Sequence, residues 1–139
     1  MDSEEFEHIF RRKFIFISEK ILKCGLSKAK TRYIQNLADF LLEKPDFLND
    51  LKAKNSEELI ESLKKIKGIG IWSASIFALF YLNHPNIYVW GDSSLVKAIS
   101  LIYKIEKFES NKLHDIIKKW DPFKSTACLI LWEWLDDYK

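Results

Sequence analysis

The stretch IKGIGIWSASIFALFYLNHPNIYVWGD, from Ile66 to Asp92, decides the fold. Its two glycines, Gly68 and Gly70, lie between two helical patterns. Upstream, residues 56–65 (SEELIESLKK) begin with a serine that suits an N-cap and carry glutamates in the first turn. Downstream, residues 72–82 (WSASIFALFYL) are almost wholly apolar, which is typical of a buried helix, and the run is too short to span a bilayer. The stretch therefore predicts two helices joined by a tight turn.

The turn itself, residues 67–70 (KGIG), has the properties of an anion site. Its glycines permit unusual backbone conformations, and its amides sit at the start of a helix, where they are unpaired and the helix dipole is positive. A phosphate is the natural ligand for such a site. Taken alone, however, two glycines between helices indicate most often a simple helix C-cap.

Composition points to one helical domain of the size of the whole chain. The chain has 139 residues, with 14% aromatic residues but only four glycines and three prolines, which favours helices over a β-sandwich or barrel. The net charge of +2 is too small to indicate nucleic acid binding, so any DNA footprint has to be local. The acidic N-terminus is unlike a signal peptide, so we expect an intracellular protein, in the cytoplasm, nucleoid or nucleus, without a membrane anchor.

Further helices are expected on both sides of the central stretch. Ser27 is predicted to cap a helix that runs to about Leu42, and Asp92 stands before a helical pattern over residues 93–103. A helix is also expected over residues 111–119. The last helix is expected to start at Pro122, within the segment WDPFKSTACLILWEWLDD.

These motifs together resemble the helix-hairpin-helix (HhH-GPD) superfamily of DNA glycosylases, and within it the 3-methyladenine DNA glycosylase II-like branch. The resemblance rests on the G-I-G turn followed by Trp-Ser-Ala, on Gly-Asp about twenty residues later, on GLSKAK at residues 25–30 and on the C-terminal segment. It implies one all-α, helix-hairpin-helix glycosylase-like domain over residues 1–139. Residues 1–24 would be divergent N-terminal helices, and residues 25–139 the glycosylase-like region with its hairpin at residues 66–72.

The resemblance also implies a catalytic residue and a base pocket. Asp92 matches the catalytic aspartate, and Trp72 and Trp132 match positions where this branch builds an aromatic pocket. Ile76 and Ser93 stand where the branch often has tyrosines. Bifunctional members carry a lysine at the position of Trp72, so this chain is expected to lack the lyase step. Read in isolation, each tryptophan fits a hydrophobic core and Asp92 fits a plain N-cap.

DNA contacts and ions follow from the same resemblance. The DNA-binding positions would be those at and beside the hairpin: Lys65, Lys67, Gly68, Ile69, Gly70 and Ser73. The family's hairpin often binds a monovalent sodium or potassium ion through backbone carbonyls, which corresponds here to Lys64, Ile66 and Ile69. No other cofactor is expected, and the two cysteines, Cys24 and Cys128, cannot supply the four ligands of an iron–sulfur cluster.

The expected function is base-excision repair of damaged double-stranded DNA, as a monofunctional hydrolase of the N-glycosidic bond of alkylated purines. Two alternatives stay open. One is a non-catalytic helix-hairpin-helix DNA-binding module or a subunit of a larger glycosylase-like assembly, and the other is a structural helical domain for a protein partner. About 24 residues precede Gly25, where the family has further helices and a DNA-inserting wedge, so the domain looks shortened at its N-terminus. A homodimer or a partner subunit would then complete the cleft.

Overall fold

The structure is a computed structural model that describes residues 20–105 and 110–138. Within these ranges every regular element is a helix and no strand occurs, which confirms the all-α fold expected from the sequence. Most of the divergent N-terminal segment, residues 1–19, lies outside the described residues; residues 20–23 are helical. In the described part of the chain, none of the helices combines the length and the apolar character needed to cross a membrane.

The chain divides into two compact units, each described here by itself. Of the described residues, unit 1 comprises 20–49 and 66–68, and unit 2 comprises 50–65, 69–105 and 110–138. The long helix of unit 1, α2 (Lys28–Glu43), begins after Ser27, whose side-chain oxygen accepts a hydrogen bond from the Lys30 amide at 3.3 Å. This is the N-cap expected from the sequence. A short helix, α3 (Phe47–Leu51), follows at the boundary of the units.

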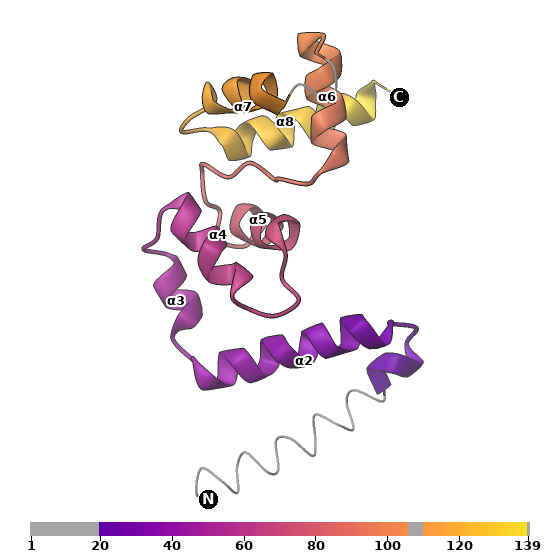
Figure 1. Cartoon of the computed structure of the whole chain (residues 1–139), viewed down its shortest axis with the longest axis vertical. Helices are drawn as coiled ribbons and strands as arrows, with labels where there is room; N and C mark the ends of the chain where they lie inside the picture. Colours follow the sequence, from indigo (N-terminus) through magenta and orange to yellow (C-terminus); the bar gives the residue numbers. More distant parts are fainter. Residues whose placement is uncertain (1–19, 106–109, 139) are drawn as a thin grey trace, which may run out of the picture. The chain divides into compact units, whose positions relative to one another are not determined.

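Unit 2 holds the remaining five helices of the described chain. They are α4 (Ser56–Lys64), α5 (Ile71–Phe80), α6 (Ser93–Tyr103), α7 (Ser110–Lys118) and α8 (Lys124–Asp137). α4 packs against α5, and α6 packs against α8 (Figure 1). Ten side chains that are at most 1% exposed form the core of the described part of unit 2: Leu51, Leu59, Ala74, Ser75, Ala78, Val89, Leu95, Ala98, Ile99 and Cys128.

Two helix starts differ from the sequence-based expectation. The N-cap of α4 is Asn55 rather than Ser56: Asn55 has extended backbone angles, and its side-chain oxygen accepts from the Glu58 amide at 3.0 Å. Helix α8 begins at Lys124 rather than at Pro122, because Phe123 still has non-helical backbone angles. Both helices exist as expected, shifted by one or two residues at their starts.

An irregular segment, residues 84–90, crosses the core of unit 2 and leads to Asp92. Ile87, Tyr88 and Val89 are all buried, so this segment has to find hydrogen-bond partners inside the unit. Ser125 supplies them: its hydroxyl oxygen accepts from the Ile87 amide at 3.0 Å and also bonds to the His84 carbonyl, while its amide donates to the Pro85 carbonyl at 3.1 Å. The first turn of α8 thereby fixes the chain that delivers Asp92.

The two turn glycines play different roles. Gly68 has φ +106°, where side chains are rarely tolerated, and a Cβ built there would lie 2.7 Å from the Cβ of Tyr33. Gly70 has φ −90° and ψ 178°, an extended conformation open to any residue, and a Cβ there would meet no atom within 4 Å. The expectation of an unusual glycine conformation is therefore right for Gly68 and wrong for Gly70.

We predict that Gly68→Ala destabilises the fold whereas Gly70→Ala is nearly neutral. The first change adds a methyl group at a positive φ and against Tyr33, which we expect to lower the free energy of unfolding by at least about 1 kcal/mol. The second adds a methyl group in open space. Urea denaturation of the two variants and the unaltered chain compares them directly, and equal loss of stability in both variants would contradict the contrast.

Candidate active site

The carboxylate of Asp92 is the centre of the candidate site. Asp92 is the N-cap of α6: its Oδ1 atom accepts hydrogen bonds from the amides of Ser94 and Leu95, each at 3.0 Å. Asp92 therefore has the N-cap role that its position in the sequence predicts. It fixes the carboxylate at the positive end of the helix dipole, which also favours the ionised form.

Two tryptophans from different helices donate to this same carboxylate. The Nε1 atom of Trp72, in the first turn of α5, lies 3.2 Å from Oδ2 of Asp92. The Nε1 atom of Trp132, in α8, lies 3.3 Å from Oδ1. The tertiary structure thus brings together Asp92, Trp72 and Trp132, the catalytic and aromatic residues expected from the sequence, although they are separated by 20 and 40 positions along the chain.

Four N–H groups determine the charge state of Asp92. Partial burial raises the pKa of its carboxyl group, but the bonds from the Leu95 amide, both indoles and the Ser94 amide lower it by more, so the pKa falls below its ordinary value. The group is therefore a carboxylate at neutral pH. Its two oxygens are not equivalent, since Oδ1 accepts three of these bonds and Oδ2 only one. Oδ2 has room for a further partner.

Phe80 completes an aromatic surface at this site that the sequence-based prediction did not include. Its ring stacks on that of Trp132, with centroids 6.0 Å apart and planes inclined by 12°. Trp72 is 47% exposed and Phe80 is 55% exposed, so indole and phenyl surface is accessible here. Trp72, Ile76 and Phe80 are four residues apart and share one face of α5. That spacing was the available signal for Phe80.

The predicted role of Ile76 and Ser93 in the base pocket stays a prediction. Ile76 is half-buried on the α5 face that also carries Trp72 and Phe80. Ser93 is exposed and is the first residue of α6, next to Asp92. Ile76 lies one turn after Trp72 on α5, and Ser93 directly precedes Ser94 on α6. Among the hydrogen bonds of the described residues, neither side chain bonds to the Asp92 carboxylate.

The predicted DNA-binding residues around the turn are mostly accessible. Lys65, Lys67, Gly68, Gly70 and Ser73 are exposed, and Ile69 is half-buried. Residues 66–68 belong to unit 1, where the Lys67 carbonyl accepts from the Asn36 side-chain amide at 3.1 Å; residues 69–73 belong to unit 2. Gly70 is the N-cap of α5 and no side chain bonds to the first amides there, so Ser73 does not cap the helix.

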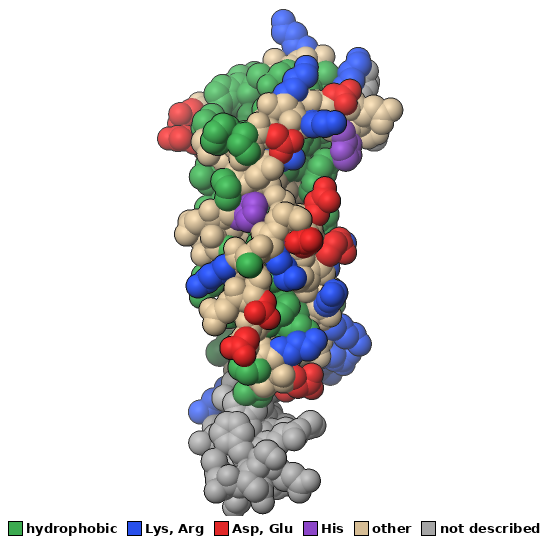
Figure 2. All heavy atoms as spheres, turned by 90° about the vertical axis from the view of Figure 1, so that its left-hand side faces the viewer, with side chains coloured by type: hydrophobic (Ala, Val, Ile, Leu, Met, Phe, Trp, Pro, Cys, Tyr) green, Lys and Arg blue, Asp and Glu red, His purple; other side chains and the backbone are tan. Residues whose placement is uncertain are grey.

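Charge and metal-ligand patterns give no further site. On the face drawn in Figure 2, Lys and Arg side chains are interspersed with Asp and Glu side chains, in keeping with the small net charge. Within residues 20–105 and 110–138, no three His, Cys, Asp or Glu side chains cluster as metal ligands. The monovalent ion expected at the backbone carbonyls of Lys64, Ile66 and Ile69 would not use such side chains and stays a prediction.

Known proteins with similar sequences or structures are named as DNA-3-methyladenine glycosylases or as a related alkylbase DNA glycosidase-like protein. An alkylbase DNA glycosidase-like protein of Schizosaccharomyces pombe is 28% identical over 83% of this chain and 55% of its own length. A DNA-3-methyladenine glycosylase of Saccharomyces cerevisiae is 30% identical over 81% of this chain and 48% of its own. The crystal structure of a DNA-3-methyladenine glycosidase from Bacillus halodurans has a TM-score of 0.72 at 30% identity, covering 84% of this chain and 54% of that one. No family model matches the sequence.

The matches extend over most of this chain but over only part of each relative. The chain spans about half the length of the curated relatives it matches. The activity of this chain is therefore proposed from its similarity to these relatives.

We predict that Asp92→Asn lowers stability at neutral pH and that its effect fades in acid. Asparagine keeps an N-cap oxygen but presents an N–H group to one of the indole donors, at a cost of about 1 kcal/mol at this partly exposed site. Because folding lowers the pKa of Asp92, its carboxylate contributes stability above the ordinary pKa of 3.8, and this contribution is lost as pH falls through the lower, folded value.

Chemical denaturation between pH 7 and pH 3 tests this prediction. The free energies of unfolding of Asp92→Asn and the unaltered chain should converge as pH falls below 3.8. Asp115→Asn, at an exposed position of α7, is the matched control and should show no such convergence. A constant difference between Asp92→Asn and the unaltered chain at all pH values would show that the hydrogen bonds do not favour the ionised carboxylate.

Proposed function

Because this chain belongs to the helix-hairpin-helix superfamily of DNA glycosylases, we propose that it hydrolyses the N-glycosidic bond of alkylated purines in damaged double-stranded DNA. Two indoles, one exposed and one partly buried, that donate hydrogen bonds to one ionised carboxylate are the observation on which this proposal rests. Such a reaction would take place on a base that has been flipped out of the duplex.

The aromatic side chains are suited to recognise the flipped base. Alkylation at a ring nitrogen gives a purine in DNA a positive charge, and a cation gains about 0.5–2 kcal/mol on the face of an indole. Phe80 stacks on one face of Trp132, so that the two rings offer an extended surface, and Trp72 is 47% exposed. Each indole N–H donates to Asp92, which holds the ring edge toward the carboxylate and leaves ring surface for stacking.

Asp92 is proposed to be the catalytic group. The bond between C1′ of the sugar and the base nitrogen breaks, and its electron pair leaves with the base, so positive charge develops on the sugar. The ionised Oδ2 atom, which accepts only the Trp72 N–H, can face that charge or orient the attacking water. A purine that already carries a positive charge is a good leaving group, so a strong general acid at the base is not required.

Residues around the turn are proposed to hold the DNA backbone. The lysines Lys65 and Lys67 are exposed, and the first amides of α5 lack intrahelical partners, as at any helix start. The positive end of the α5 dipole adds to their attraction for a phosphate. We assign phosphate contacts to Lys65, Lys67, Gly68, Ile69, Gly70 and Ser73, and base contacts to Ile76 and Ser93 beside the tryptophans.

We predict that Asp92→Asn removes base excision but not DNA binding. Loss of the charge that faces the developing cation should lower the excision rate on methylated duplex DNA by at least about 100-fold. Binding to a duplex with an abasic-site analogue should change little, because it depends on backbone contacts. Strand cleavage at the products by alkali, together with a gel-shift titration, measures both quantities, and Asp115→Asn again serves as control.

Full excision by Asp92→Asn would remove Asp92 from the catalytic role. Salt-dependent duplex binding without any excision by the unaltered chain would instead identify a non-catalytic DNA-binding module. Light scattering of the same samples would show whether activity requires a homodimer.

We further predict that the reaction is monofunctional. Trp72 stands where bifunctional members of the superfamily carry a lysine, and an indole cannot form a Schiff base with the sugar. Incubation with methylated duplex DNA and borohydride should therefore trap no covalent protein–DNA adduct. Trapping of an adduct in proportion to base release would show that another amine of the chain acts as nucleophile.

A further inference from the structure

The turn at residues 66–68 rests on α2, a helix that does not flank it. These three residues belong to the same compact unit as α2, whereas α4 and α5 belong to the other unit. The Nδ2 atom of Asn36 donates to the Lys67 carbonyl at 3.1 Å. The ring of Tyr33 lies against Gly68, on the side where a Cβ would be. Because Tyr33 and Asn36 are three residues apart, one face of α2 supports the turn from both points.

The hydrogen bond from Asn36 fixes the direction of the Gly68 amide. The Lys67 carbonyl and the Gly68 N–H belong to one peptide group, and in a trans peptide these two bonds point in opposite directions. Within the described residues the cis peptide bond is Asp121–Pro122, so the Lys67–Gly68 bond is trans. Since the carbonyl is directed toward α2, the Gly68 N–H is directed away from it.

This N–H is free to bind a ligand. Gly68 is exposed and lies outside the helices, and in the described part of the chain its amide donates to no carbonyl or side chain. The side chain of its neighbour Lys67 is also exposed. A backbone N–H beside a lysine suits a phosphate oxygen, which accepts hydrogen bonds and is attracted by the positive charge.

We propose that Asn36 is a positioning residue for DNA binding, which aims the Gly68 amide at a phosphate of the DNA backbone by holding the Lys67 carbonyl. Tyr33 supports the same orientation from the other side of Gly68. The inference rests on the proposed function, in which the turn holds the DNA backbone, and adds residues of α2 that act through the turn. A phosphate contact reads no base, so the effect of Asn36 is the same on damaged and undamaged duplexes.

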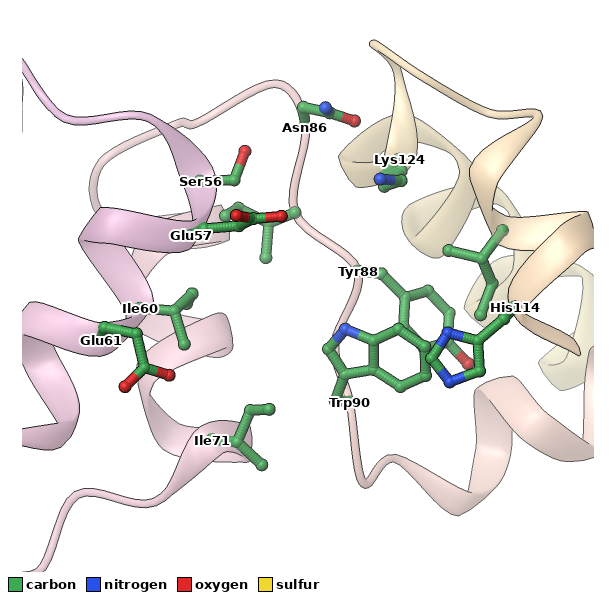
Figure 3. A pocket seen from close by; sticks show the side chains of 12 residues that line it. Ser56, Glu57, Ile60, Glu61, Ile71, Asn86, Tyr88, Trp90, His114 and Lys124 are labelled. Atoms are coloured by element: carbon green, nitrogen blue, oxygen red, sulfur yellow. The ribbon is translucent and has the colours of Figure 1, made fainter. Parts of the chain in front are cut away.

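Glycine signals in nuclear magnetic resonance spectra can locate the contact. The chain has four glycines, and Gly68 is the only one that follows a lysine. Labelling of glycine with ¹⁵N and of the lysine carbonyl with ¹³C therefore identifies the Gly68 amide signal. Gly91 is a second reporter, because it lies between Asp92 and Trp90. Trp90 lines a cavity of about 530 Å³ in unit 2, and none of residues 66–70 lines that cavity (Figure 3).

A titration of the full chain with a short undamaged duplex tests the proposed contact. The Gly68 signal should shift saturably as DNA is added, while that of Gly25, before α2, should not. Absence of a Gly68 shift would overturn the proposal. A shift of Gly91 without one of Gly68 would place the ligand at the cavity or at Asp92, and would overturn it as well.

Matched variants test the part played by Asn36. Asn36→Ala should weaken binding of undamaged and methylated duplexes equally, by about fivefold. The slope of affinity against salt concentration should stay the same, because no charge is removed. Asn49→Ala makes the same change at an exposed position of α3 in the same unit and should leave affinity unchanged. Asn36→Gln keeps the amide donor and should recover most of the lost affinity.

The outcomes of these measurements separate a positioning role from a structural one. Urea denaturation of Asn36→Ala that shows lower stability, together with full affinity for DNA, would make Asn36 structural only and overturn the proposal. Equal affinities of Asn36→Ala and Asn49→Ala would do the same.

An excision assay on the unaltered chain separates this inference from the proposed reaction. Excision without a Gly68 shift would keep the proposed function and overturn the role of Asn36. A Gly68 shift that Asn36→Ala weakens, without any excision, would support the role of Asn36 in a non-catalytic DNA-binding module.

Discussion

The candidate site depends on one carboxylate that serves three helices. Asp92 caps α6, and its two oxygens also accept the indole N–H groups of α5 and α8. Removal of the carboxylate would leave both indoles and two backbone amides without their acceptor, so structure and proposed chemistry draw on the same group. The four N–H groups also keep the carboxylate ionised, which is the form that can stabilise a developing positive charge.

The position of Asp92 is set by a buried segment without regular structure. Residues 87–89 are covered on all sides, and such a segment is stable only if its backbone groups are paired. Ser125 provides that pairing from the first turn of α8, the helix that also carries Trp132. Helix α8 therefore both fixes the segment before Asp92 and carries Trp132, so it sets the distance between the Asp92 carboxylate and the Trp132 indole.

Part of the aromatic surface at the Asp92 site is accessible. Trp72 and Phe80 are 47% and 55% exposed, although large apolar side chains on a helix of the core would normally be covered. Accessible aromatic surface beside the half-buried carboxylate of Asp92 suits a ligand that is flat and positively charged.

The sequence by itself predicted the helices and the turn, because apolar periodicity and the N-caps Ser27 and Asp92 are properties of short segments. The choice of Asp92, Trp72 and Trp132 as candidate site residues came from the family resemblance and stays a prediction. Only the tertiary structure decided that Trp72 and Trp132 both bond to Asp92, that Phe80 joins them, and that Gly68 but not Gly70 needs a glycine conformation. These features arise from contacts between residues far apart in the chain, and the packing that creates such contacts leaves no periodic or local signal in the sequence.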